Sequence, residues 1–298
     1  MCEDISGKYL DNEKIQLIQK KLIKNVDNPK LKIDLITLPD KRNINIIQDG
    51  ILLVGTIQRV VKLFIKKIIK DNPLITTLIY TGTSDGFGAL AIAYAGYKLG
   101  LKCNIYLSGD MSNKTFKSRQ ITTLQALGAN IKLCSSWDLA KKLMNNESYD
   151  KSTNIWKPLE GYYIAPLGLN DNEGVMTDLL SKQIIKASKN ILSFNLRIWL
   201  VVGSGGIASS ISKAFPNAKL FIYLRGSGRI KKIIEWANNN PNITILNSLK
   251  INNTSKNNRP SYYSSVSNYD DMIWPYIKKY GLNGDYIWNI ASDDYILF

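Results

Sequence analysis

The chain has 298 residues, of which 45% are apolar, so it can bury a sizeable core in one large domain or two smaller ones. It contains no histidine, which excludes histidine-activated serine or cysteine nucleophiles and histidine metal ligands. The formal net charge of +15 would attract phosphate backbones or an acidic partner, but the lysines are spread along the chain without a basic block. We therefore favour a solvated basic surface, with nucleic-acid binding as the alternative.

The sequence shows neither the pattern of a targeting signal nor the CxxC spacing of paired cysteines. The first residues are acidic rather than basic and apolar, and the long apolar stretch at residues 191–202 falls short of the roughly 20 residues that a membrane span needs. We therefore expect a cytoplasmic protein without membrane association. The cysteines, Cys2, Cys103 and Cys134, are odd in number and lack CxxC spacing, so we expect reduced thiols and no metal site.

Strands and helices are expected to alternate along most of the chain. Short β-branched or apolar runs predict strands, and longer runs with helical periodicity predict helices. In chain order we expect strand 74–80, helix 88–100, strand 103–107, helix 114–127, strand 130–134, helix 137–145, helix 173–188, strand 197–202, helix 207–214, strand 220–224, helix 230–238 and strand 243–246. This alternation predicts an α/β fold of open parallel sheets with helices on both faces.

One glycine loop has the sequence of a phosphate-binding turn. Gly203, Ser204, Gly205 and Gly206 stand between a strongly apolar strand and a helix. Glycines let backbone N–H groups approach an anion, and the helix that follows contributes its positive end. The loop matches neither the P-loop nor the full dinucleotide fingerprint, and a structural tight turn is the alternative.

A second loop follows the strand expected at 74–80. It contains Thr83, Ser84, Asp85 and Gly86 and leads into the next helix. Open α/β folds bind ligands at this end of their strands, and hydroxyls and backbone amides there suit a carboxylate. The alternative is an ordinary helix N-cap by one of the three polar residues.

In this order, the pieces resemble the fold type II pyridoxal-phosphate (PLP) dependent enzymes, the tryptophan synthase β and cysteine synthase type. The likeness is greatest to the aminocyclopropane-carboxylate deaminase and D-cysteine desulfhydrase branch. The matching segments are 84–93 with 98–103, 127–131, 164–168 with Gly174, and 203–206. Together they span most of the chain. The resemblance implies PLP as cofactor, a small amino acid as substrate, and a homodimer.

The resemblance also implies a role for each loop. The cofactor phosphate would be held by Gly203, Ser204, Gly205 and Gly206. The substrate carboxylate would be held by Thr83, Ser84, Asp85 and Gly86. Ser264, Ser265 or Asn289, near the C-terminal end, would face the pyridine nitrogen of the cofactor.

The Schiff-base lysine of this family lies in a short motif of small and polar residues followed by an arginine. The matching residues here are Gly55, Thr56, Gln58 and Arg59, but Ile57 occupies the lysine position. That lysine forms the imine with the cofactor and then moves the substrate α-proton, and an isoleucine can do neither. The resemblance therefore implies a PLP-dependent lyase or deaminase whose catalytic lysine is missing and whose cofactor is kept or lost.

Three interpretations stay open. The simplest is a pseudoenzyme with a structural or regulatory role, with or without a phosphorylated ligand. Alternatively, the register of the match is shifted, and Lys62 in first place, or Lys66 or Lys67, reaches the cofactor from the next helix. The spacing of these lysines is typical of solvated side chains. An engineered change or an unusual chemistry is the third.

The polar stretch at about 135–160 resembles a crossing between two lobes. We expect residues 61–160 to form a small inserted lobe with the substrate loop. Residues 1–60 and 161–298 would form a large lobe with the phosphate loop, and the ligand would lie between the lobes.

Overall fold

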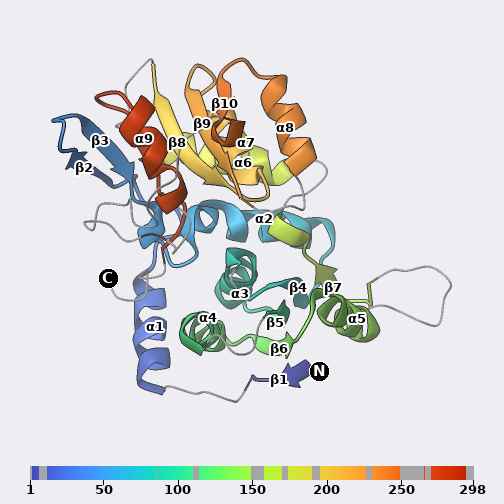
Figure 1. Cartoon of the computed structure of the whole chain (residues 1–298). Coiled ribbons are helices and arrows are strands. Elements are labelled where there is room, and N and C mark those ends of the chain that lie inside the picture. The colour runs from blue at the N-terminus through green and yellow to red at the C-terminus, as the bar shows by residue number, and fades with distance from the viewer. Residues whose placement is uncertain are drawn as a thin grey trace. The chain divides into compact units, whose positions relative to one another are not determined.

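The structure is a computed structural model of the chain, and it describes residues 2–6, 12–84, 86–109, 114–148, 158–169, 174–189, 195–225, 230–248, 265 and 270–292. The chain divides into two compact units (Figure 1). Unit 1 contains residues 1–27 and 60–176, and unit 2 contains residues 28–59 and 177–298. Each unit is built around one sheet. Unlike the expected large lobe, unit 2 excludes residues 1–27, because the N-terminal strand pairs within the unit 1 sheet.

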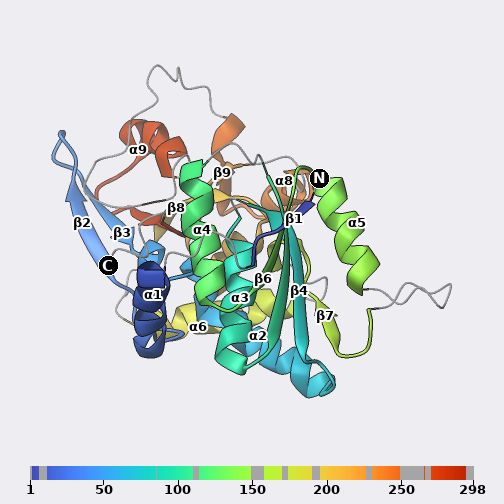
Figure 2. The same ribbon diagram turned by 90° about the horizontal axis from the view of Figure 1, so that it is seen from below.

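The sheet of unit 1 has five strands in the order β1-β6-β5-β4-β7. The strands are β1 (Cys2–Asp4), β4 (Thr77–Thr83), β5 (Lys102–Ser108), β6 (Asn130–Cys134) and β7 (Tyr162–Ile164). The four later strands run parallel and β1 runs antiparallel, so the sheet is mixed rather than purely parallel. α3 (Phe87–Leu99) and α4 (Lys114–Ala126) lie against one face and α5 (Trp137–Ser148) against the other (Figure 2).

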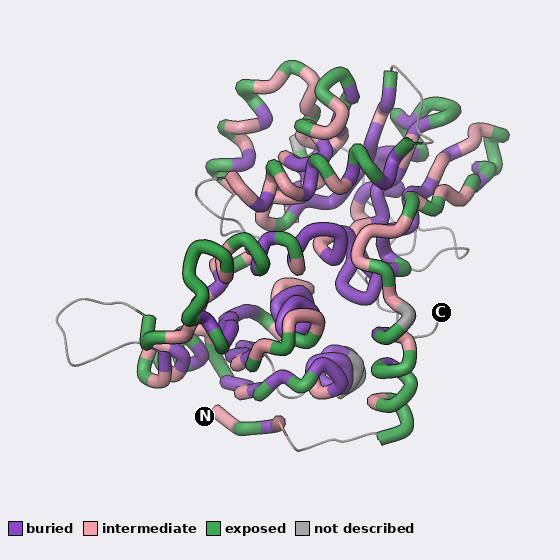
Figure 3. The backbone as a smooth tube through the Cα atoms, turned by 180° about the vertical axis from the view of Figure 1, so that it is seen from behind, coloured by how far each residue is buried: buried purple, intermediate pink, exposed green. Residues whose placement is uncertain are grey.

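The remaining helices of unit 1 lie outside this sandwich. They are α1 (Asn12–Lys24), most of α2 (Gln58–Asp71) and the short 3-10 helix η3 (Leu167–Leu169). α1 packs on α4 and is mostly exposed along its length (Figure 3). α3 is the opposite case, because its residues from Ala89 to Gly96 are all buried. A Cβ atom at Gly96 would overlap the sulfur of Cys103, so glycine lets α3 approach β5 closely.

The sheet of unit 2 has six strands in the order β10-β9-β8-β11-β3-β2. The strands are β2 (Ile33–Thr37), β3 (Asn43–Ile47), β8 (Arg197–Val202), β9 (Lys219–Leu224), β10 (Ile243–Ile245) and β11 (Tyr286–Trp288). All neighbours are parallel except β2 and β3. The helices of the unit are α6 (Val175–Ala187), α7 (Gly206–Ala214), α8 (Ile230–Asn238) and α9 (Trp274–Tyr280), with 3-10 helices η1 (Asp49–Ile51), η2 (Gly55–Ile57), η4 (Leu246–Ser248) and η5 (Asp270–Met272).

One core cluster of unit 2 joins α9 to the sheet. It contains buried side chains from β2, β3, β8 and β11, with Trp199 and Trp274 fully buried. Trp199 also stacks on Phe221, with ring centroids 4.3 Å apart. Its indole N–H donates to Asp285 Oδ2 at 2.7 Å, so the buried polar tip is satisfied. This packing fixes β8 and β11, the two strands whose carboxyl ends carry the segments discussed below.

The expected α/β class and the alternation of elements are confirmed. The largest shift is in β4, which begins three residues later than expected and continues to Thr83. The residues after Tyr80 remain in the strand because each pairs with β5, as far as Thr83 opposite Ser108. Leu74, placed in the strand from sequence, is instead an exposed residue of the preceding turn.

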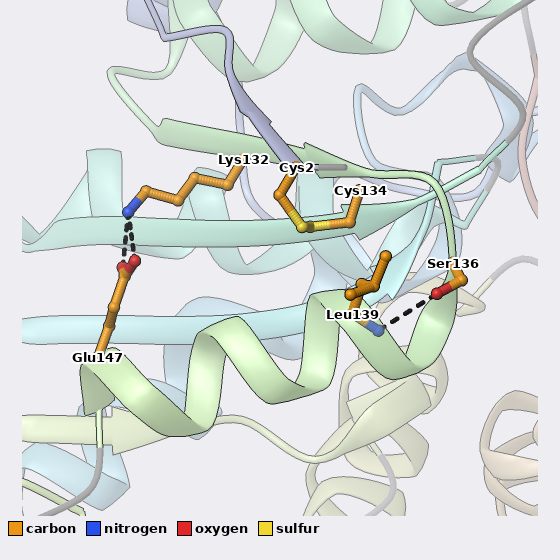
Figure 4. The surroundings of a disulfide bond; sticks show 6 residues. All are labelled: Cys2, Lys132, Cys134, Ser136, Leu139 and Glu147. Carbon is orange, nitrogen blue, oxygen red and sulfur yellow. Dashed lines mark hydrogen bonds and ion pairs between the residues drawn. A yellow bond between two sulfur atoms is a disulfide. The ribbon is translucent and has the colours of Figure 1, made fainter.

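The expectation of three reduced thiols is wrong. Cys2 and Cys134 form a disulfide (Figure 4). Cys103 is free and buried, as expected. The pairing arises because β1 lies antiparallel on β6 with these two residues opposite each other. Within the described ranges there is no cluster of three or more cysteine and acidic residues that could hold a metal. No helix among them is long and apolar enough to cross a membrane.

Candidate functional site

The first candidate site is the glycine loop of unit 2. β8 ends at Val202, and α7 begins at Gly206 after a turn in which Gly205 takes a φ of 90°. This positive φ favours glycine, and a Cβ there would also approach Ile233 Cγ1 to 3.2 Å. Among the described residues, no side chain caps the helix, so its first N–H groups have no side-chain acceptor at the cap. The loop therefore offers backbone donors and the positive end of a helix to an anion.

The position of this loop in the sheet also suits a ligand. From β8 the chain continues to β9 and β10 towards one edge, whereas β11 and β3 lie on the other side of β8. Ligands of open α/β sheets bind at such a reversal, beside the carboxyl ends of the strands. β3, β8 and β11 are parallel, so the residues after Val202, after Trp288 and after Ile47 lie along the same edge.

The second feature at this edge is η2, which carries Ile57. Its backbone is tied to the segment after β11, because the Thr56 N–H donates to the Ile290 carbonyl at 2.8 Å. The Trp288 indole N–H donates to Thr56 Oγ1 at 3.0 Å. Gly55 has a φ of 67°, and a side chain there would overlap the Ile290 carbonyl oxygen. η2 is therefore packed directly against the end of the central strand.

A buried ion pair fixes the segment on the other side of Ile57. Arg59 and Asp49 are each 1% exposed, and the guanidinium donates to both carboxylate oxygens, at 3.0 Å from Nε and 2.5 Å from the terminal nitrogen. The other terminal nitrogen donates to Asn28 Oδ1 and to the Pro29 carbonyl, both at 2.7 Å. Ile57 thus lies between two anchored residues, half-buried and with an apolar side chain.

Lys62, the first alternative to position 57 as the Schiff-base residue, has a partner in unit 1. Its ammonium donates to Asp27 Oδ2 at 2.6 Å, and the Tyr94 hydroxyl donates to Asp27 Oδ1 at 2.7 Å. Burial by itself would raise the pKa of Asp27, but these two hydrogen bonds and the charges of Lys62 and Lys98 lower it overall. Lys66 and Lys67 are exposed on α2.

The loop after β4 is the third candidate feature. Ser84 donates its N–H to the Ser108 carbonyl at 2.8 Å, and Gly86 donates its N–H to Thr83 at 3.2 Å. The N-cap of α3 is Gly86, which has no side chain to cap the helix, so the N-cap is neither Thr83 nor Ser84. Asp85 lies outside the described residues. The start of α3 carries the positive end of the helix dipole, which favours an anion.

Sequence reasoning missed one contact that shapes this loop. Gln120 on α4 is buried, and its amide donates to the Gly86 carbonyl at 2.6 Å. Thr81 Oγ1 and Gln120 Oε1 are buried and have no hydrogen-bond partner within the part of the chain that the structure describes. No sequence signal links Gln120 to Gly86, because the contact joins two different helices across 34 positions.

The residues expected near the pyridine nitrogen have mixed outcomes. Ser264 lies outside the described residues, and Ser265 is buried. Asn289 follows β11 directly, and its amide nitrogen donates to Gln48 Oε1 at 3.2 Å. A Cβ at Gly50 would come within 2.6 Å of that amide nitrogen, so glycine at position 50 makes room for the Asn289 side chain.

Comparison with solved structures identifies the fold. A hydrogen sulfide-producing enzyme from Fusobacterium nucleatum has a TM-score of 0.60 at 15% identity, covering 96% of this chain and 99% of that one. An ACC deaminase homologue has a TM-score of 0.58 at 13% identity, covering 94% and 96%. Escherichia coli diaminopropionate ammonia lyase in its apo form has a TM-score of 0.54 at 12% identity, covering 100% and 96%. No protein-family model matches the sequence, and a search of curated proteins finds no match.

These structural neighbours are fold type II PLP enzymes, and the likeness extends over nearly the whole chain. At such low identity the likeness is one of fold. The chain therefore has the PLP type II fold that the sequence motifs predicted.

Proposed function

We propose that this chain binds a phosphorylated ligand in unit 2, PLP or a molecule with the same phosphate group, and that it does not form the Schiff base of lyases and deaminases. The observation that carries this proposal is the isoleucine at position 57. Thr56 on one side is bonded to Ile290, and Arg59 on the other is paired with Asp49. The segment is held as firmly as a reactive residue would require, but its side chain has no nitrogen.

The residues of unit 2 suit the phosphate of the cofactor and do not suit its covalent attachment. The uncapped N-terminus of α7 and the glycines before it provide donors for a phosphate. PLP, when bound, supplies an aldehyde and an electron-withdrawing ring to amino-acid chemistry. Ile57 offers no amine to the aldehyde and no base to the substrate. We therefore derive no catalytic step and infer a pseudoenzyme with a ligand-binding role.

Lys62 has a structural role, as the partner of Asp27. Its ammonium already binds Asp27, and Asp27 also accepts the Tyr94 hydroxyl. The three side chains tie the segment after α1 to α2 and α3. To attack an aldehyde, Lys62 would have to leave Asp27. The Lys62 side chain is 25% exposed and the Asp27 side chain is 31% exposed.

In unit 1, we infer that Thr83, Ser84 and Gly86 receive the carboxylate of a small amino acid. The support is the start of α3, where the cap residue Gly86 supplies no capping side chain. The Gln120 amide orients the Gly86 carbonyl and so contributes to the shape of the turn. Binding here would use the hydroxyls of Thr83 and Ser84 and the positive end of α3, which suits a carboxylate better than a cation.

Two variants of Gly206 test the phosphate site. A Cβ at this position meets no atom within 4 Å, and an acidic residue in the first turn favours helix formation, so both variants should fold. Gly206→Asp places a negative charge where the phosphate would bind, and Gly206→Asn is its neutral match in shape. We expect Gly206→Asp to bind PLP at least about tenfold more weakly than Gly206→Asn, which corresponds to about 1.4 kcal/mol.

Equilibrium dialysis measures both affinities, with pyridoxal, which lacks the phosphate, as the comparison ligand. The charge should affect PLP much more than pyridoxal. Equal PLP affinity for the two variants and the wild type would show that the phosphate is not held by this loop. Failure of the wild type to bind PLP at all would contradict the choice of ligand.

A further inference from the structure

One row of residues crosses the carboxyl edge of the unit 1 sheet. Cys2 on β1 lies opposite Cys134, the last residue of β6. Ser108 on β5 lies opposite Cys134, and Thr83 on β4 lies opposite Ser108. The row therefore runs from the N-terminal strand to the start of the loop proposed for the substrate carboxylate. The disulfide between Cys2 and Cys134 closes its outer end (Figure 4).

Hydrogen bonds and close packing connect the disulfide to that loop. The Gly109 N–H donates to the Cys134 carbonyl at 3.2 Å. Gly109 also packs on Ser84, because a side chain at position 109 would overlap Ser84 Oγ. The Ser84 N–H in turn donates to the Ser108 carbonyl at 2.8 Å. A change at Cys134 can thus reach Ser84 through one hydrogen bond and one direct contact.

Besides the disulfide, β6 has anchors on both sides of Cys134. The Lys132 ammonium pairs with Glu147 at 2.6 Å, which ties the middle of β6 to the last turn of α5. Ser136 Oγ accepts the Leu139 N–H at 3.3 Å in the first turn of that helix (Figure 4). Cys134 lies between these anchors, held by the disulfide on one side and by the Gly109 N–H on the other.

β1 is held more weakly. It pairs with β6 over three residues at the edge of the sheet. Beyond the strand, the Ile5 N–H donates to the Ile131 carbonyl at 3.0 Å, and Ser6 Oγ accepts the Ile131 N–H at 2.8 Å. A strand this short relies on its cross-link, because few backbone bonds oppose the entropy gained when it separates.

The three cysteines differ in their access to a reductant. Cys2 is partly exposed, whereas Cys134 is fully buried. A thiolate from solution therefore attacks Cys2 Sγ, with Cys134 as the leaving group. Cys103 does not compete, because it is buried against α3 and burial raises the pKa of its thiol to about 12.

We propose that the Cys2–Cys134 disulfide is a redox switch that orders the end of β4 at Thr83 and the residue that follows it, Ser84. Opening it consumes two molecules of a small thiol such as glutathione. The first thiolate forms a mixed disulfide with Cys2 and releases Cys134, and the second releases Cys2 and leaves as the oxidised thiol dimer. Two electrons and two protons pass to the protein sulfurs, and the reverse exchange closes the switch. Only the identity of what the loop binds rests on the proposed function.

Non-reducing peptide mapping is the first test. After incubation with oxidised glutathione, we expect a Cys2–Cys134 linked peptide and a free Cys103. Free thiols at both Cys2 and Cys134 would overturn the proposal.

Amide-resolved hydrogen exchange is the second test, and it needs no ligand. Reduction should speed exchange at Gly109 and Ser84 by about tenfold or more, together with the residues of β1. Cys2→Ser should exchange like the reduced wild type and should not respond to reductant, which makes it the matched control. Faster exchange confined to residues 2–6 would show that the disulfide holds the strand without ordering the loop. A failed PLP-binding test would leave this result unchanged, so the two proposals fail separately.

Discussion

Replacing Arg59 with methionine should be among the most damaging single changes in unit 2. Arg59 and Asp49 are each 1% exposed, and four hydrogen bonds of 3.0 Å or less leave the guanidinium for Asp49, Asn28 and Pro29. Methionine fills much of the space of the arginine side chain but carries no charge. The buried Asp49 carboxylate then keeps the Trp288 indole N–H, which donates to Asp49 Oδ2 at 3.2 Å, but loses its positively charged partner. Breaking a buried pair in this way costs about 3–5 kcal/mol.

The double variant Asp49→Asn/Arg59→Met separates the pair from simple packing. It removes both charges, so the remaining cost is that of the lost hydrogen bonds, about 1–3 kcal/mol. Urea unfolding followed by tryptophan fluorescence measures both variants, and we expect the double variant to be the more stable of the two. A loss below about 1 kcal/mol for Arg59→Met, or a double variant less stable than Arg59→Met, would refute the buried anchor.

Further changes test the other features. Ile57→Lys should give the protein an imine absorption band with PLP, and borohydride should trap that imine at position 57. Ile57→Met should show neither. Absence of the band in a folded Ile57→Lys variant that binds PLP would contradict the inferred role of η2. Asp27→Asn should lower the free energy of unfolding most above about pH 4, because the pKa of Asp27 is lowered on folding. The contribution of Asp27 to stability disappears as the pH falls through that lowered pKa. A loss of stability that is the same at pH 3 and pH 7 would contradict the Lys62 pairing. Cys2→Ser should lower stability by up to about 5 kcal/mol for a cross-link spanning 132 positions, and thiol reductant should lower the wild-type thermal midpoint but not that of the variant.

The regular elements could be predicted because local patterns determine them. The strand at residues 130–134, the strand at 197–202 and the helix at 230–238 have the expected bounds. Each is a short apolar or amphipathic run between glycine or polar turns, so its periodicity alone specifies it. The glycine turn at residues 203–206 belongs to the same class, since the strand, the glycines and the helix are adjacent in sequence.

Long-range pairs could not be predicted in the same way. Trp288 and Asp49 are 239 positions apart, and neither residue carries a local signal of the other. β1 was missed because three residues of mixed polarity give no periodicity, and its antiparallel pairing with β6 then brought Cys2 opposite Cys134. The odd number of cysteines wrongly indicated that all three are reduced. One buried cysteine, Cys103, packs in the core, whereas the other two form a disulfide.

This chain has the PLP type II fold, and we propose that it has no Schiff-base lysine. The most direct measurement is borohydride reduction of the wild-type protein with stoichiometric PLP, followed by peptide mass spectrometry, with pyridoxal in parallel to reveal nonspecific labelling of surface lysines. We expect bound PLP to be released on denaturation, with no lysine labelled in near one-to-one yield. A single lysine labelled in that yield by PLP and not by pyridoxal, at Lys62 or elsewhere, would contradict the claim and identify the residue that replaces position 57.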